Sequence, residues 1–177
     1  MQDYFAEALV EFIDMRALII DIRGNHGGVW PVRKILAENL VGEPALFCRY
    51  RSRERTNEIY LEPVENPYNG SLAVLVDVLS MSSAEEFAGS LQTNRRGTIV
   101  GERTPGICVV CDFMELPNGA LFMFPVEQSI TGNGTVLEGH GVIPDIKVAL
   151  DRNQLLQGID TQLTAAIRHL RSEKGIE

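Results

Sequence analysis

The sequence predicts an α/β fold in which buried strands alternate with helices along one domain. Two apolar runs, residues 17–22 and 72–78, each with a single aspartate next to its last residue, have the composition of strands buried on both faces of a parallel sheet. Each run is followed by small or flexible residues and then by apolar residues at helical spacing. A chain of 177 residues suits one domain of ordinary size, so we expect residues 1–177 to form a single core.

The elements around the first run follow from the same periodicity. Residues 2–14 carry apolar side chains at helical spacing, and residues 23–28 (RGNHGG) form a dense turn signal before a helix that runs to about residue 41. Residues 45–62 alternate in polarity, which predicts exposed strands or an edge hairpin. Their arginines form either a solvated strand face or a site for an acidic peptide or a carboxyl terminus; these are Arg49, Arg51, Arg53 and Arg55.

The second half continues the pattern. Serines and then two glutamates open a helix that ends near residue 94, and residues 98–101 form a short strand. An Asn-Gly turn between residues 108–116 and 121–127 predicts a hairpin. A last strand is expected at residues 146–150. A final amphipathic helix is expected at residues 154–171, with five apolar residues on its inner side: Leu155, Ile159, Leu163, Ile167 and Leu170.

Composition and charge exclude several classes of function. The net charge of −8 disfavours nucleic acid and anionic membrane surfaces as partners. No apolar run approaches the roughly 20 residues that a membrane span needs, and the first 14 residues do not resemble a signal peptide. The cysteines Cys48, Cys108 and Cys111 are odd in number, and neither they nor the histidines show zinc spacing. We therefore expect no metal and no cofactor.

Two turns between strand and helix carry the candidate chemistry. Gly27 and Gly28 offer backbone N–H groups that could hold an anion, although a tight turn would also need glycine. Ser82 stands at a helix entrance, where the positive helix end favours an oxyanion, although a serine there can simply cap the helix. Neither signal is specific by itself.

Taken together and in order, these blocks resemble the C-terminal processing (tail-specific) serine peptidases. Their relatives include the tricorn protease core and the interphotoreceptor retinoid-binding protein modules. The resemblance is carried by residues 17–28, 74–85, 116–119 (LPNG) and 138–145 (EGHGVIPD), and it covers about residues 17–148. It implies a ClpP/crotonase-like spiral of βαβ units, with Ser82 as the nucleophile. It also implies an oxyanion hole built from the amides of Gly27, Gly28 and Ser83.

The sequence departs from the serine-lysine branch of that family at the general base. Ile107 stands where those members carry a lysine, so the chain is more similar to the tricorn and retinoid-binding branch. Glu138 matches a glutamate that, in tricorn-like members, works with a histidine from upstream of the core. Because a serine needs a base to attack at neutral pH, His26 and His140 are the candidates within this chain.

These features lead to three hypotheses of function. The first is a serine peptidase core that acts on a peptide or protein substrate added as a strand beside the sheet. The second is an inactive module of the same fold that binds a peptide or apolar ligand. The third and weakest is a crotonase-like acyl-thioester enzyme. We expect a segment or peptide-binding domain upstream of this core. Homo-oligomerisation stays open, and so does the compartment, although family members are often extracytoplasmic.

Overall fold

The computed structural model describes residues 2–28 and 31–174, and its centre is a four-stranded parallel sheet. The strand order is β1-β4-β5-β8, and each neighbouring pair is parallel. The bounds are Ala17–Asp21 for β1, Ser71–Val76 for β4, Thr98–Gly101 for β5 and Ile146–Lys147 for β8. The predicted α/β class is confirmed, although the last strand is shorter than the expected residues 146–150.

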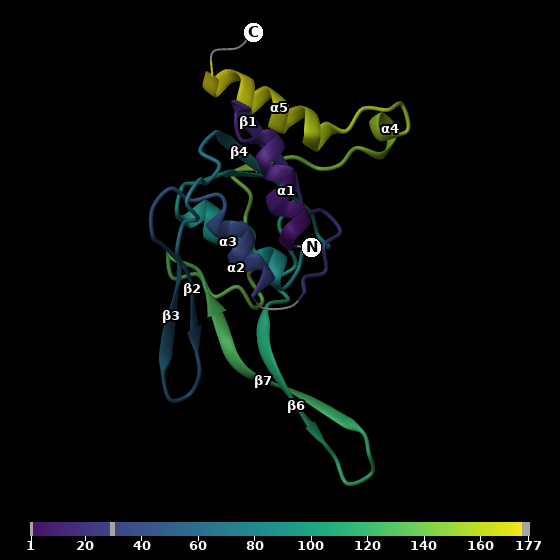
Figure 1. Ribbon diagram of the computed structural model, residues 1–177. Helices are drawn as coiled ribbons and strands as arrows, with labels where there is room; N and C mark the ends of the chain where they lie inside the picture. The colour runs from purple at the N-terminus through teal and green to yellow at the C-terminus, as the bar shows by residue number, and fades with distance from the viewer. Residues whose placement is uncertain (1, 29–30, 175–177) are drawn as a thin grey trace.

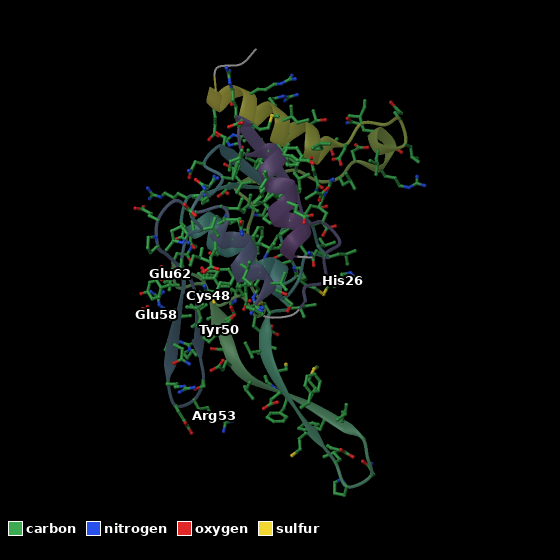
Figure 2. The ribbon with its side chains drawn as sticks, in the orientation of Figure 1. His26, Cys48, Tyr50, Arg53, Glu58 and Glu62 are labelled. Atoms are coloured by element: carbon green, nitrogen blue, oxygen red, sulfur yellow. The ribbon has the colours of Figure 1, made fainter. Side chains whose placement is uncertain are left out.

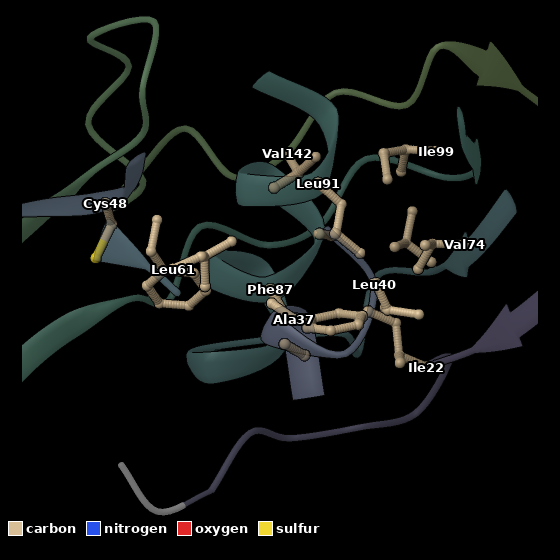
Figure 3. Close-up of a cluster of buried hydrophobic side chains, with 14 of the residues drawn as sticks. Ile22, Ala37, Leu40, Cys48, Leu61, Val74, Phe87, Leu91, Ile99 and Val142 are labelled. Carbon is tan, nitrogen blue, oxygen red and sulfur yellow. The ribbon is translucent and has the colours of Figure 1, made fainter. Parts of the chain in front are cut away.

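The strand β4 is buried on both faces, which explains its unbroken apolar sequence. Val74 and Val76 join the larger core cluster, which includes residues of α2 (Val32–Glu38) and α3 (Ser83–Thr93). Figure 3 shows this cluster between the helices and the sheet. Ala73 and Leu75 face the opposite side, where they pack with residues of α5 (Thr161–Lys174). Side chains alternate along a strand, so a layer of helix on each face demands apolar residues at every position.

A second, antiparallel sheet has the order β3-β2-β7-β6. It consists of two hairpins, β2 with β3 and β6 with β7, as the sequence predicts. The bounds are Ala45–Arg51 for β2, Thr56–Leu61 for β3, Val109–Glu115 for β6 and Leu121–Ile130 for β7. The hairpins are joined where residues 49–51 of β2 pair with residues 128–130 of β7. In Figure 1 both hairpins project from the same end of the body.

The helices differ from the predicted ranges at their ends. Helix α1 (Gln2–Phe12) is somewhat shorter than expected, and α2 ends at Glu38 rather than near residue 41, because Asn39 caps it. Among the residues that the structure describes, no helix reaches the length and apolarity that crossing a bilayer requires.

The prediction of one continuous helix over residues 154–171 is wrong. The segment contains the short helix α4 (Arg152–Leu155), a turn in which Gly158 has a φ of +82°, and then α5. This break shifts the helical phase, so the expected inner face is not the buried one. Ala166 and Leu170 are buried, whereas four of the five expected inner residues are exposed: Leu155, Ile159, Leu163 and Ile167.

The burial of β4 gives a direct stability test. Leu75 is fully buried between the sheet and α5, so Leu75→Ala should lower the free energy of unfolding by about 2–5 kcal/mol through lost contacts and a residual cavity. Val78, just beyond the strand, is 54% exposed, and Val78→Ala should change it by less than about 0.5 kcal/mol. Urea unfolding followed by circular dichroism measures both, and equal effects would contradict the described packing.

Candidate active site

The two candidate turns meet because their strands are neighbours in the parallel sheet. β1 pairs with β4, and the carboxyl ends of parallel strands lie at the same edge. Beyond the strands, the Met81 N–H donates to the Asn25 carbonyl over 3.0 Å. The buried Ser80 hydroxyl donates to the Ile22 carbonyl over 2.9 Å. The glycine turn and the serine turn are therefore one bonded unit.

Ser82 occupies a backbone conformation that is unusual for a residue with a side chain. It stands between the end of β4 and the start of α3, with a φ of +57° and a ψ of −123°. Such a conformation costs on the order of 1–3 kcal/mol and persists only where the surroundings impose it. A sharp strand-to-helix turn with this kind of strain presents a nucleophilic serine in other hydrolase folds.

Gly27 lies directly against Ser82. It has a φ of +92°, and a Cβ added there would lie 2.8 Å from the Ser82 Cβ and 2.9 Å from the Met81 carbonyl oxygen. Both the backbone angle and the available space therefore require glycine at this position. The close approach places the Gly27 peptide beside the candidate nucleophile.

Two of the three expected oxyanion donors, the amides of Gly27 and Gly28, are already hydrogen-bonded. The Gly27 N–H donates to Asn25 Oδ1 over 2.9 Å, and the Gly28 N–H donates to Ser83 Oγ over 2.6 Å. The Ser83 hydroxyl in turn donates to the Gly28 carbonyl over 2.9 Å. A substrate oxyanion at these amides would have to replace the Asn25 or Ser83 oxygen. The oxyanion-hole assignment of Gly27, Gly28 and Ser83 stays a prediction.

The buried carboxylate of Glu85 holds the serine turn in place. It is fully buried and accepts four hydrogen bonds, from the N–H groups of Ser82 (3.0 Å), Gly106 (2.8 Å) and Ile107 (3.0 Å) and from the Thr104 hydroxyl (2.6 Å). It thus joins the start of α3 to the segment that leads into β6. Sequence reasoning identified Glu85 only as an acid in the first turn of a helix.

Its neighbour Glu86 belongs to a second buried network. Arg33 of α2 forms an ion pair with Glu86, and the Tyr50 hydroxyl lies 3.1 Å from Glu86 Oε1 and 2.6 Å from the Arg33 guanidinium. Burial raises the pKa of Glu86, while Arg33 acts against that rise. The network connects α2, α3 and β2 through buried side chains. The sequence did not reveal it, because its members come from three distant segments.

Glu138 reaches the serine turn through one intervening residue. Its Oε2 accepts from the Cys108 N–H over 2.8 Å, and the Cys108 thiol donates to the Ser82 carbonyl over 3.4 Å. An open hollow of about 440 Å³ adjoins it and is lined by residues that include Arg51, Arg53, Val109, Pro125, Val126 and Glu138.

The histidine candidates are exposed, and neither is bonded to the Glu138 carboxylate. His26 lies on the glycine turn at the surface (Figure 2). His140 Nδ1 lies 3.1 Å from the backbone oxygen of Glu138 instead. Ile107, at the position of the family lysine, is 55% exposed, and its carbonyl accepts from the Ser82 N–H over 2.9 Å. The residue at the lysine position is thus beside Ser82, but it carries no base.

The three cysteines are free thiols. Cys48 and Cys108 are buried, whereas Cys111 is partly exposed on β6. Burial raises the pKa of the Cys48 thiol to about 12 and also raises that of the Cys108 thiol. In the part of the chain that the structure describes, no three His, Cys, Asp or Glu side chains are placed to hold a metal ion.

A serine on a strained strand-to-helix turn, packed against a glycine turn from the neighbouring strand, is an arrangement that resembles the nucleophile turns of α/β hydrolases. Residues 1–148 match the model of peptidase family S41, and the chain belongs to this family. The carboxyl-terminal-processing protease of Synechocystis is 31% identical over 127 residues, which are 72% of this chain and 30% of that protein.

Solved structures agree with this membership. The photosystem II D1 C-terminal processing protease has a TM-score of 0.73 at 25% identity, over 84% of this chain and 38% of its own. The tricorn protease has a TM-score of 0.71 at 25% identity, over 92% of this chain and 16% of its own. The expected fold is thus that of known S41 peptidases. The chain spans about 30% of the curated relatives it matches.

The Glu85 network predicts a large stability loss. Glu85→Ala leaves the buried Thr104 hydroxyl and Gly106 N–H and the partly buried Ile107 N–H without their acceptor, whereas the Ser82 N–H keeps the Ile107 carbonyl. Each buried donor left unpaired costs roughly 1–3 kcal/mol, so we expect a loss of at least about 2 kcal/mol. Glu54→Ala, in the exposed turn between β2 and β3, is the matched control and should change stability by less than about 0.5 kcal/mol. Thermal and urea unfolding measure both variants. A Glu85→Ala variant whose free energy of unfolding equals that of the wild type would contradict the described hydrogen bonds.

The cysteine environments predict selective alkylation. At pH 8 iodoacetamide should modify Cys111 in the folded protein, because Cys48 and Cys108 are buried with raised pKa values. All three should react after denaturation in urea. Peptide mass spectrometry locates the label, and fast modification of Cys108 in the folded chain would contradict its described burial beside Ser82.

Proposed function

We propose that this chain is the catalytic core of a serine-type peptidase that hydrolyses peptide bonds through an acyl-enzyme on Ser82. Glu138 orients a histidine that acts as general base, and the amides of Gly27 or Gly28 and of Ser83 bind the oxyanion. The observation that carries the proposal is the strained Ser82 backbone at the start of α3, with Gly27 packed against it. Membership of a peptidase family supports a peptide or protein as the substrate.

The start of α3 supplies the electrostatic part of the mechanism. The first N–H groups of a helix have no partner within the helix, and the helix dipole makes this end positive. An oxyanion formed next to Ser82 would gain stabilisation from the Ser83 N–H at this end. Rotation of Asn25 or Ser83 would release a second donor, from Gly27 or Gly28.

The described residues do not place a general base next to Ser82. Ile107 cannot accept a proton, so another side chain must act as the base, and the resemblance to tricorn-like members favours a histidine. We propose that the base is a histidine from a longer natural chain, as in tricorn-like members, with His26 as the candidate within these residues. His26 follows Asn25, whose carbonyl bonds to the residue before Ser82. Glu138 contacts the Ser82 turn only through Cys108, so the Glu138 carboxylate has no direct link to the Ser82 hydroxyl. A histidine side chain between the two would supply that link.

An edge strand beside Ser82 supports a mode of substrate binding. Of the described strands, only β7 pairs with β6, so the outer edge of β6 is open. β6 starts at Val109, two residues after the carbonyl that bonds to Ser82. An extended peptide added along this edge would pass the Ser82 turn, with the hollow near Glu138 open to its side chains. Homo-oligomerisation belongs to the same proposal.

The other two hypotheses have less support. The missing lysine at Ile107 is the observation that would suit an inactive binding module. The curated relatives are named as proteases, however, which favours catalysis over that alternative. Nothing in the comparisons favours an acyl-thioester enzyme.

A fluorophosphonate probe tests the proposal. In the longer natural protein we expect labelling of the chain that Ser82→Ala abolishes, together with a fall in peptide hydrolysis of at least ~1,000-fold. Ser172→Ala, on the exposed end of α5, is the matched control and should leave both unchanged. Mass spectrometry identifies the labelled residue.

Each other outcome has a defined meaning. The isolated chain should react poorly, because its base is incomplete, and rapid hydrolysis by it would assign the base to His26 or His140. An unlabelled full-length protein that binds peptides or apolar ligands would replace the proposal with the binding module. Saturable binding of a coenzyme A thioester would favour the third hypothesis.

A further inference from the structure

The side chain of Arg23 joins the glycine turn to the start of α5. Arg23 opens this turn (residues 23–28), two residues after the end of β1. Its guanidinium forms an ion pair with Asp160 at 2.8 Å, donates to Gln162 Oε1 over 2.9 Å and forms a second ion pair with Asp21 at 2.7 Å. The Arg23 side chain is only 17% exposed, so water competes little for these contacts. One turn of the candidate site is thus attached to the last helix of the described chain.

Gln162 lies where three strands of the parallel sheet end. It is fully buried, and its side-chain amide donates to the Val148 carbonyl over 2.9 Å and lies 3.5 Å from Glu102 Oε2. Arg23 follows β1, Glu102 follows β5 and Val148 follows β8. The carboxyl ends of parallel strands form one edge of a sheet, and this edge also carries Ser82. The helix α5, which packs on β1 and β4 (Figure 1), therefore has its start bonded to the edge of the candidate site.

Asp160 makes two different contacts at the start of α5. Its Oδ1 accepts from the Leu163 N–H over 2.9 Å, which caps the first turn of the helix, and its Oδ2 carries the ion pair with Arg23. The hydrogen bond from Arg23 is the main reason that the pKa of Asp160 lies below its usual value. Hydrogen bonds between charged groups are stronger than neutral ones. The position of the α5 start and that of the Arg23 side chain are therefore coupled.

Arg23 stands two residues before Asn25, which shapes the candidate oxyanion hole. The Asn25 carbonyl accepts from the Met81 N–H over 3.0 Å, and Asn25 Oδ1 accepts from the Gly27 N–H over 2.9 Å. Gly27 in turn packs against Ser82. The donors of an oxyanion hole stabilise the transition state only when they point at the developing charge, so their direction affects the chemical step more than substrate binding. A fixed Arg23 therefore helps to set the direction of the Gly27 donor.

We propose that the α4–α5 segment, residues 149–174, positions the glycine turn of the active site through Asp160 and Gln162. This segment lies outside residues 1–148, which match the S41 family model. Asp160 and Gln162 are positioning residues that act through Arg23 and do not touch the substrate. The effect on catalysis rests on the proposed function, whereas the effect on the turn itself does not.

Variants at the two ends of α5 test the proposal in the longer natural protein. Asp160→Asn keeps a capping oxygen but removes the ion pair, and Gln162→Met keeps the volume but removes the hydrogen bonds. Each should lower kcat for peptide hydrolysis about tenfold, because the Gly27 donor is misplaced, and leave KM within about twofold. Circular dichroism and thermal unfolding should show that the variants stay folded at the assay temperature.

His169→Ala is the matched control. The His169 side chain is 24% exposed, against 20% for Asp160, and its Nε2 lies 2.9 Å from Thr98 Oγ1. This contact also holds α5 on the sheet, but it lies at the amino end of β5, at the edge opposite Ser82. His169→Ala should leave kcat unchanged. An equal fall of kcat in His169→Ala and Asp160→Asn would overturn the proposal, because a loosened helix alone would then explain the loss.

A double variant tests whether the effect passes through Arg23. Arg23→Gln should lower kcat at least as much as Asp160→Asn, and the two changes together should be no worse than Arg23→Gln alone, because both remove the same ion pair. Losses of kcat that multiply in the double variant would overturn the proposed path.

Hydrogen exchange separates the failure of this proposal from the failure of the proposed function. In Asp160→Asn the amides of residues 24–28 should exchange about tenfold faster than in the wild type, whereas His169→Ala should leave them unchanged. A wild-type protein that neither hydrolyses peptides nor reacts with a fluorophosphonate would end the proposed function, and exchange alone would then decide whether the α4–α5 segment positions the turn. Unchanged exchange in Asp160→Asn would overturn the proposal in an active or an inactive protein. In an active protein, faster exchange with a wild-type kcat would also overturn it.

Discussion

The buried carboxylate of Glu85 is the interaction on which the candidate site depends. It accepts hydrogen bonds from both sides of the site, from Ser82 at the start of α3 and from Gly106 and Ile107 before β6. A fully buried carboxylate is costly unless its oxygens are satisfied, and here four donors converge on it. The strained Ser82 conformation therefore persists because the Glu85 contacts and the Gly27 approach impose it together.

The site also shows how a parallel sheet creates a constellation from distant residues. Residues 23–28 and 77–82 are far apart in sequence, yet the pairing of β1 with β4 places both turns at one edge. Bonds from Met81 to Asn25 and from Ser80 to Ile22 then join the turns directly. The Arg33–Glu86–Tyr50 network also stabilises the two turns, because it holds α2, which follows the glycine turn, against α3, which follows the serine turn. The Ser82 turn and the glycine turn are thus held by direct hydrogen bonds between them and by the contact between α2 and α3.

The described chain has a well-buried centre and exposes apolar residues on its outer elements. The strands β4 and β5 and the helix α3 bury nearly all of their apolar residues, whereas the β6–β7 hairpin and the outer face of α5 expose many of theirs. The curated relatives that this chain matches are about three times as long as the chain. Glu138 lines the hollow at the base of the β6–β7 hairpin, and the outer edge of β6 has no partner among the described strands.

The sequence by itself determined the strands, the two hairpins and the motifs around Gly27, Ser82 and Glu138, because burial periodicity, turn residues and helix caps act over short distances. It did not determine where the final helix divides, since Gly158 and the packing of Ala166 against β4 set that phase. Nor did it reveal the hydrogen-bond partners of Glu85 and Glu86. It also did not reveal that the Gly27 and Gly28 N–H groups donate to side-chain oxygens of Asn25 and Ser83. These features depend on contacts between distant segments, and only the tertiary structure decides which segments meet.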